Sequence, residues 1–287
     1  MVVDKPGGLT SHDVVARVRR LAGTRRVGHA GTLDPMATGV LLVGVGRATR
    51  LLGHLSLHDK DYLATVRLGQ TTSSDDAEGA LLDVRSCAQI SPDGVAAAAA
   101  GFVGDIEQRP PAVSAIKVAG RRAYARARAG EEVVLASRRV RVTRFDVVDV
   151  RRRDDHDDVV DVDVEVTCSS GTYVRALARD LGEKLGVGGH LVALRRTRVG
   201  AFGLSGARTL ADLEASFELT PLDAAASAAF ARRDLDAEAA ATLSHGGALA
   251  ASDMGGQPVA AFGPDGVFLA LLEDRGDLAR PIAVFVG

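Results

Sequence analysis

One stretch of this chain of 287 residues, 28–39, carries the side chain best placed for chemistry. Its sequence GHAGTLDPMATG contains a single carboxylate, Asp34, which Pro35 follows directly. Proline fixes its own backbone and disfavours helix at the preceding residue, and glycine allows tight turns or close approach to a ligand. The apolar run 40–43 comes next and predicts a buried strand. A carboxylate on a constrained loop ahead of such a strand is a candidate catalytic group.

A simpler interpretation of Asp34 is structural. Aspartate before proline in a glycine-rich loop is usually a turn residue. From the loop alone the turn is the favoured interpretation, so a role in chemistry depends on the segments that accompany it.

A second segment with candidate functional residues is 168–177, CSSGTYVRAL. The alternating run 160–166 predicts a half-buried strand leading into it, and a helix is expected over about 173–185 with Thr172 as its cap. Arg175 then lies in the first helical turn, where the helix dipole disfavours a cation. An arginine at this place is better explained if a carboxylate partner lies close by.

The rest of the pattern is that of helices mixed with strands. Valine and leucine at helical spacing predict a helix over 12–21 with Thr10 or Ser11 as its cap, and strict alternation predicts a strand over 60–68. Further helices are expected over 91–101, 210–222 and 237–243, and further strands over 40–45, 138–150, 259–262, 267–272 and 282–286, whereas 191–199 fits either element.

Acidic residues and cysteines give no sign of a metal site. The loop 71–79 contains Asp75, Asp76 and Glu78 without histidines or the ligand spacing of a calcium loop, so we expect it to be solvated. The acidic run 154–158 is expected at a hairpin tip. Cys87 and Cys168 are far apart and form no CxxC pair, so neither a disulfide framework nor a zinc site is expected.

Basic residues are clustered, although the net charge is −2 and the pI is near 6.4. Arginine forks suit phosphates and stack on bases. For any single cluster a solvated helix face is the favoured interpretation, but several clusters beside motif segments are harder to explain in that way. Aromatic residues make up only 4% of the chain, which disfavours extensive stacking platforms and draws attention to Tyr62, Tyr124 and Tyr173. The clusters are Arg17, Arg19, Arg20, Arg25 and Arg26; Arg121, Arg122, Arg126 and Arg128; Arg138, Arg139 and Arg141; and Arg195, Arg196 and Arg198.

The length of the chain and a change in its sequence pattern predict one large domain followed by a small β-rich one from about residue 235. No run is long and apolar enough for a membrane span, and no charged-then-apolar leader indicates export, so a cytoplasmic location is expected. Pro110 and Pro111 precede a basic stretch at 120–126, which predicts a stiffened loop running into a basic helix.

Several separated segments share one order along the chain. They are Asp4-Lys5-Pro6 with Gly8 and Thr10-Ser11; 28–39; Lys60 and Tyr62 with Arg67-Leu68-Gly69; Pro111 with Ser114-Ala115 and Lys117; 168–175; and Leu194-Arg195-Arg196. Together they resemble the TruB family of tRNA pseudouridine synthases. Each match is weak alone, and their joint order over most of residues 2–200 makes the resemblance specific.

The resemblance implies an α+β pseudouridine synthase fold with a mixed, mainly antiparallel central sheet, flanking helices and an active site in a cleft that crosses the sheet. It implies a catalytic domain over 1–230 with a thumb-like insertion at about 106–135. A small β-rich PUA-like domain that binds RNA is expected over 231–287.

The family isomerises uridine 55 in the T-arm of tRNA to pseudouridine, so the resemblance implies tRNA, through its T-stem-loop, as the partner. The base is detached at N1, turned and rejoined through C5, and no cofactor or metal is expected because the reaction is internal. The target must be flipped out of a folded loop. A monomer without an obligate protein partner is implied.

Site residues follow from the same resemblance. Asp34 corresponds to the essential aspartate, whether it attacks the base or sugar or assists cleavage. Arg175 corresponds to an arginine that pairs with it and favours its charged form. Tyr62 corresponds to a stacking tyrosine whose hydroxyl is a candidate for managing the C5 proton. Further expected substrate-binding residues are His29, Lys5, Lys60, Tyr173, Leu194, Arg121, Arg122 and Arg126.

The sequence also allows other roles for two of these residues and other functions for the protein. His29 is equally well explained as a loop histidine bonded to backbone, and Tyr173 as packing. A tRNA-folding chaperone without catalysis would use the same fold, and a nucleotide-binding enzyme is disfavoured because Walker spacing and a GxGxxG turn are missing. The family usually has several residues ahead of Asp4, so either a truncated first strand or a start assigned too far downstream is expected.

Overall fold

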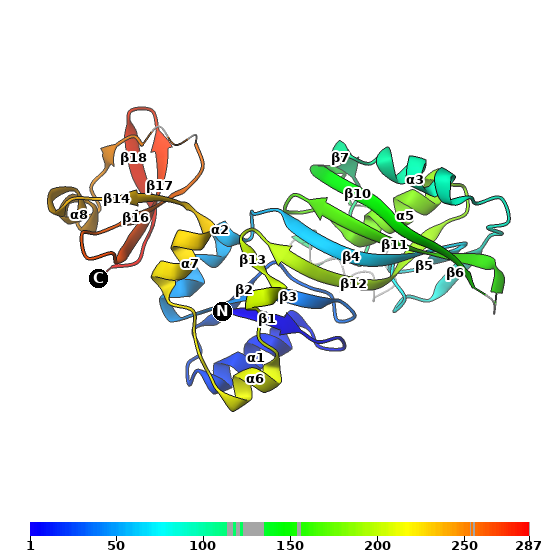
Figure 1. The fold of residues 1–287 in the computed structure, drawn as a ribbon, viewed down its shortest axis with the longest axis horizontal. Coiled ribbons are helices and arrows are strands. Elements are labelled where there is room, and N and C mark those ends of the chain that lie inside the picture. Colours follow the sequence, from blue (N-terminus) through cyan, green and yellow to red (C-terminus); the bar gives the residue numbers. More distant parts are fainter. Residues whose placement is uncertain are drawn as a thin grey trace.

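The computed structural model describes residues 1–113, 117–118, 121–122, 135–153, 156–252, 254 and 256–286. A long mixed sheet carries helices, and a second sheet follows at the C-terminal end of the chain (Figure 1). The predicted α+β class is confirmed.

The long sheet has the strand order β1-β3-β12-β4-β11-β10-β7, with β2 beside β3 and β13 beside β12. β3 and β12 run parallel, and its other ladders in the described part of the chain are antiparallel. The strands are β1 (Val2–Lys5), β2 (Val27–Ala30), β3 (Thr38–Val45), β4 (Lys60–Leu68), β7 (Gly104–Gln108), β10 (Arg138–Arg153), β11 (His156–Cys168), β12 (Gly189–Val199) and β13 (Phe202–Gly203).

The two central strands show why one was predictable and the other ambiguous. β4 keeps strict alternation, so Tyr62, Ala64 and Val66 all point into the core. β12 instead has register shifts between Leu191 and Ala193 and between Arg196 and Arg198. Such bulges break the period of two that identifies a strand, so its sequence fits helix and strand alike.

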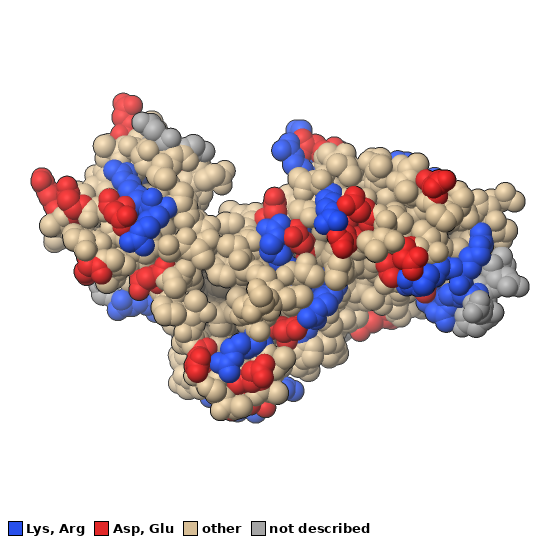
Figure 2. All heavy atoms as spheres, viewed as in Figure 1, with Lys and Arg blue, Asp and Glu red and all other residues tan. Residues whose placement is uncertain are grey.

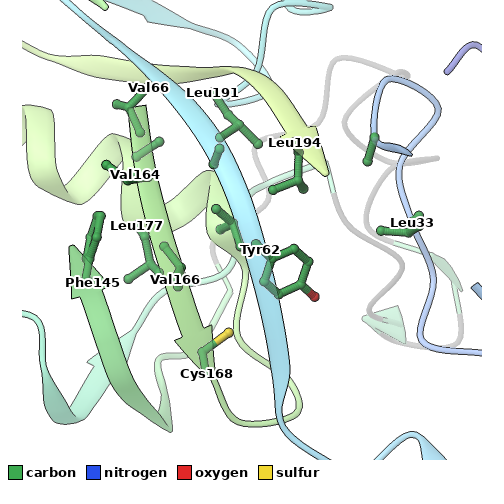
Figure 3. Packing of buried hydrophobic residues seen from close by; sticks show 14 of the residues in the cluster. Leu33, Tyr62, Val66, Phe145, Val164, Val166, Cys168, Leu177, Leu191 and Leu194 are labelled. Carbon is green, nitrogen blue, oxygen red and sulfur yellow. The ribbon is translucent and has the colours of Figure 1, made fainter. Parts of the chain in front are cut away.

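Helices pack on the long sheet. Capping residues next to them explain where two of these helices begin. α1 (Ser11–Leu21) begins at Thr10, which forms a capping box with Asp13. α3 (Pro92–Ala100) is capped by Ser91. α5 (Val174–Lys184) packs on β12 and β4 and buries Leu177 and Leu181 (Figure 3).

Two predictions about helices are wrong. The cap of α5 is Tyr173 and not Thr172, because the Thr172 hydroxyl donates to the carbonyl of Ser169 at 3.0 Å within the preceding turn. The helix expected over 210–222 is two helices, α6 (Leu210–Ala215) and α7 (Leu222–Ala229). Ser216 adopts an extended backbone that ends α6, and Pro221 then begins α7.

The C-terminal sheet has the order β14-β16-β17-β18-β15. It shares an apolar core with β3 and α2, in which Phe262, Phe268 and Phe285 take part. Arg47 and Arg50 donate to the carbonyls of Phe285 and Val284 at 3.1 and 2.7 Å. The elements are η1 (Gly46–Arg50), α2 (Leu52–Leu55), β14 (Ala231–Asp234), α8 (Ala237–Ser244), β15 (Leu249–Ala250), β16 (Val259–Phe262), β17 (Phe268–Arg275) and β18 (Leu278–Val284).

Basic side chains on the outward face of the long sheet form ion pairs with carboxylates on other strands of the same sheet. Blue and red side chains lie side by side over this sheet in the space-filling view (Figure 2). Several clustered arginines are therefore already paired. The pairs are Arg67–Asp161, Arg139–Asp105, Arg141–Asp105, Arg195–Asp4 and Arg198–Asp61.

Within the described ranges, none of the helices has the length and apolar character needed to cross a bilayer.

Candidate active site

Segments far apart in the sequence meet around a cleft of about 500 Å³. The loop after β2 contributes Asp34, β4 contributes Lys60 and Tyr62, and β12 contributes Leu194. Tyr62 points its hydroxyl from the sheet toward the loop that carries Leu33 (Figure 3). The other wall consists of Arg138 and residues 170–175, with Tyr173 and Arg175. Lys5 and His29 are not part of this lining.

Three buried polar side chains hold the loop that carries Asp34. The Ser11 hydroxyl donates to the carbonyl of Leu33 at 3.0 Å and accepts from its N–H at 2.9 Å. Lys5, which is fully buried, donates to the carbonyls of Pro35, Leu9 and Pro6. Lys5 thus lies behind the loop, and its predicted contact with substrate has no support from this position.

Arg196 is the third of these side chains and fixes the two ends of the same loop. Its guanidinium donates to the carbonyl of Gly31 at 2.8 Å and to that of Val40 at 2.7 Å, and the side chain is only 1% exposed. Gly39 allows β12 to come this close, because its φ is +97° and an added Cβ would lie 2.2 Å from the carbonyl oxygen of Arg196. The glycines of the motif therefore let Arg196 reach the loop, which keeps Asp34 in one position.

Arg175 connects Asp34 to a second carboxylate. Its Nε lies 2.9 Å from Oδ2 of Asp34, an ion-pair contact outside hydrogen-bond alignment, and Nη2 donates to Oδ1 at 3.4 Å. Its Nη1 lies 3.4 Å from Oδ2 of Asp76. The same guanidinium donates to the carbonyls of Ser74 and Val113 at 2.8 and 2.9 Å. The carboxylate partner that an arginine in the first turn of α5 required is therefore present.

Asp75 and Asp76 overturn the expectation of a solvated acidic loop. Asp76 is buried and accepts from the Ser74 hydroxyl at 2.5 Å, and Asp75 pairs with Arg179 at 2.9 Å. Burial raises the pKa of Asp75, which Arg179 opposes. The loop packs against β12, where Leu191 exchanges backbone hydrogen bonds with it. A local window of sequence contains no sign of these partners, because both arginines come from α5, a hundred residues further along.

The two tyrosines of the cleft differ in their surroundings. Tyr62 is buried, and this burial raises the pKa of its hydroxyl, so the group is protonated at neutral pH. Tyr173 is half-buried, and Arg138 lies over its ring at 4.7 Å. The buried amide of Gln108 accepts from the N–H of Tyr173 at 2.8 Å and donates to its carbonyl at 3.1 Å. Gln108 therefore fixes the start of α5, a role that no pattern in the sequence indicates.

His29 lies on β2 beside the Asp34 loop. Its ring packs edge-on against His12, with ring centroids 5.3 Å apart. Burial lowers the pKa of His29, so its imidazole is neutral at pH 7. Nδ1 is buried and has no hydrogen-bond partner within the described residues. The alternative of a loop histidine bonded to backbone therefore finds no support at this nitrogen.

The predicted thumb falls largely outside the described residues. Within it, β8 (Lys117–Val118) and β9 (Arg121–Arg122) form a two-stranded ladder. The basic helix expected here is thus wrong for Arg121 and Arg122, whose backbone is extended. Arg126, and the side chains of Arg121 and Arg122, lie outside what the structure describes.

Three sequence families match consecutive parts of the chain. Residues 19–174 match the TruB family pseudouridylate synthase N-terminal domain. Residues 175–231 match the tRNA pseudouridylate synthase B C-terminal domain, and residues 230–286 match the C-terminal domain of tRNA pseudouridine synthase II.

Curated relatives match over the full length. A protein of Thermobifida fusca (strain YX) named tRNA pseudouridine synthase B is 59% identical over 288 residues, which are 100% of this chain and 98% of that protein. A protein of the same name from Streptomyces coelicolor is 55% identical, covering 99% of this chain and 96% of that protein.

Solved structures share the fold. A chain from a Cbf5–Nop10–Gar1 complex has a TM-score of 0.74 at 28% identity, covering 100% of this chain and 83% of that chain. A chain from an H/ACA RNP bound to a substrate RNA containing 2'-deoxyuridine also has a TM-score of 0.74, at 26% identity, covering 100% and 84%. Together with the sequence matches, this fold and its cleft define a pseudouridine synthase. Within that class, the chain belongs to the TruB family.

Proposed function

We propose that this protein converts uridine 55 of tRNA to pseudouridine and that Asp34 is its essential catalytic group. The observation that carries the proposal is the ion pair between Asp34 and Arg175 in a cleft shared with Tyr62. It is supported by relatives named tRNA pseudouridine synthase B. The loop is held from three sides, so the carboxylate is positioned before substrate arrives.

The chemistry needs few groups because the product is an isomer of the substrate. The bond between C1′ and N1 of the target breaks, the base turns, and a bond from C1′ to C5 forms as the C5 proton leaves. Asp34 attacks the base or the sugar, or assists cleavage. Arg175 orients the carboxylate through two contacts.

The simplest test uses the proton that the reaction must release. Unmodified tRNA transcript labelled with tritium at C5 of uridine should lose label to water when incubated with the protein, at about one tritium per tRNA. A protein that only folds tRNA would leave the label in place. Retention of all label with intact, folded protein would contradict the proposed function.

Three substitutions distinguish the role of Tyr62 from that of Tyr173. Tyr62→Phe keeps the flat ring, so it should bind tRNA normally and lose much of its rate, because the hydroxyl can no longer take up and pass on a proton. Tyr62→Leu should also lose some affinity, since base–aromatic stacking is worth about 1–3 kcal/mol. Tyr173→Phe should be far milder. Single-turnover rates on saturating tRNA decide this, and equal damage at both tyrosines would contradict the ranking.

RNA binding is proposed for the thumb and for the C-terminal sheet, which we take as a PUA-like domain over 231–287. Replacing Arg121, Arg122 and Arg126 by glutamine should weaken tRNA binding. The slope of log affinity against log salt should flatten by roughly one unit for each phosphate that is no longer neutralised. An unchanged slope would show that these arginines do not bind phosphates.

A further inference from the structure

We propose that Lys60 and Arg196 form an anion site at the floor of the cleft, which stabilises the negative charge of the uracil base while it is detached from the ribose. This inference rests on the proposed function and adds to it a group that acts on the leaving base, separate from the Asp34–Arg175 pair.

Both cations are buried in the protein at the cleft. Lys60 is 6% exposed and Arg196 is 1% exposed, and within the described residues neither forms an ion pair with a carboxylate. Lys60 donates to the carbonyls of Ser56 and His58 at 2.8 and 2.7 Å. Arg67, on the same strand as Lys60, is paired with Asp161 on the outward face. The contrast shows that Lys60, unlike Arg67, has no carboxylate in ion-pair contact among the described residues.

The two side chains converge at the place where a flipped base would lie. An added Cβ on Gly31 would be 3.2 Å from Nη1 of Arg196 and 3.5 Å from Cε of Lys60. Lys60 precedes Tyr62 by two residues on β4, so both point to the same face. Arg196 is the direct partner of Tyr62 across the β4–β12 ladder. A base stacked on Tyr62 would therefore have both cations beside it.

The charge balance of the cleft favours an anionic ligand. Four of its described lining residues are basic, namely Lys60, Arg138, Arg175 and Arg196, and one is acidic, Asp34. Burying a cation without a partner is costly unless a ligand supplies the missing charge. Burial and the neighbouring Arg196 lower the pKa of Lys60 to about 8, and the nearby Asp59 opposes this shift without cancelling it.

The depth of the site distinguishes the base from a phosphate. A phosphodiester is joined to the RNA backbone on both sides and stays near the rim, whereas a flipped base is the part that reaches the floor. When the C1′–N1 bond breaks, its electron pair stays on N1, and the charge spreads onto O2 and O4 of the base. When C5 later bonds to C1′, the base gives up this electron pair and becomes neutral. The C5 proton then leaves to water and N1 takes up a proton from water, so the product is again neutral. Lys60 and Arg196 keep their protons throughout and act as donors.

The test compares two leaving groups. Fluorine at C5 withdraws electrons, so 5-fluorouracil leaves more readily as an anion and needs less help. We would measure single-turnover consumption of the starting nucleoside in tRNA carrying uridine or 5-fluorouridine at the target, for the wild type, Lys60→Met and Lys60→Arg. Arg67→Met is the matched control, because it removes one charge from the same strand on the outward face.

Lys60→Met should lose about 10²–10³-fold in rate on uridine, as expected when one donor to a developing anion is removed. The loss on 5-fluorouridine should be about tenfold smaller, and Lys60→Arg should recover part of the rate on uridine. For Arg67→Met, the change in rate relative to the wild type should be the same on uridine and on 5-fluorouridine. Thermal unfolding of each variant verifies that it is folded.

A pH profile gives a second readout. The charged or titratable groups packed around Lys60 are Arg196 of β12, Cys168 of β11, and Asp59 and His58 of its own turn. Because protonated Lys60 is the active form, the wild-type rate should fall above about pH 8, and the rate of Lys60→Arg should not.

Three outcomes would overturn the proposal. Equal rate losses on both substrates would show that Lys60 does not act on the leaving base. Weaker tRNA affinity with a flatter salt dependence would identify a phosphate site instead. A Lys60→Arg variant no more active than Lys60→Met would exclude a role for the charge. Failure of the proposed function is recognised separately, because the wild type would then consume neither substrate.

Discussion

Replacing Asp34 by asparagine should abolish pseudouridine formation while tRNA affinity changes less than about tenfold. The substitution keeps the size of the side chain and removes its charge, so it can neither attack nor assist cleavage of the glycosidic bond. Affinity is retained because phosphate contacts dominate RNA binding, and a carboxylate such as Asp34 does not attract phosphates. Single-turnover conversion and a tRNA binding titration measure the two effects.

Asp161→Asn is the matched control for this substitution. Asp161 is also paired with an arginine, but on the outward face of the sheet. Its variant should convert tRNA at nearly the wild-type rate. A near wild-type rate for Asp34→Asn as well would remove Asp34 from the mechanism.

The second large effect is expected for Arg175→Met. This change leaves Asp34 without its orienting partner and Asp76 as an unpaired buried carboxylate. Removing one partner of a buried ion pair costs about 3–5 kcal/mol in the free energy of unfolding. We expect the rate to fall by about 10³-fold or more, since the orientation of the catalytic carboxylate depends on this contact. Urea unfolding and single-turnover rates measure the two effects.

A double variant separates catalysis from stability. Adding Asp76→Asn to Arg175→Met replaces the unpaired buried carboxylate by a neutral amide, so part of the stability should return. The rate should not return, because Asp34 still lacks its partner. If the rate recovered together with stability, Arg175 would be a structural residue only.

The parts of the site that could be predicted from the sequence are those determined by residues close together in the chain. The strand that carries Tyr62 was predicted over its whole length because its alternation is strict. A carboxylate partner for Arg175 was expected because helix-dipole physics makes a lone cation in the first turn of a helix unfavourable. Asp34 itself resembled a turn residue until the other segments of the family pattern were considered together.

What the sequence did not reveal depends on contacts between distant residues. Asp76 resembles a loop acid in its own window, and only the arrival of α5 makes it a buried partner of Arg175. Arg196 and Ser11 hold the Asp34 loop from residues far away in the chain. Lys5 was expected to bind substrate, and its three carbonyl partners come instead from the tight turn that follows it and from Pro35. Local patterns predict helices and strands, whereas these hydrogen bonds and ion pairs depend on tertiary contacts.

The most direct measurement of the central claim is position-resolved mapping of pseudouridine in an otherwise unmodified tRNA. Wild-type protein should produce the modification at uridine 55, Asp34→Asn should produce none, and a transcript with cytidine at position 55 should remain unmodified. Modification that appears at another uridine, or that persists in Asp34→Asn, would contradict the account of both substrate and catalytic group.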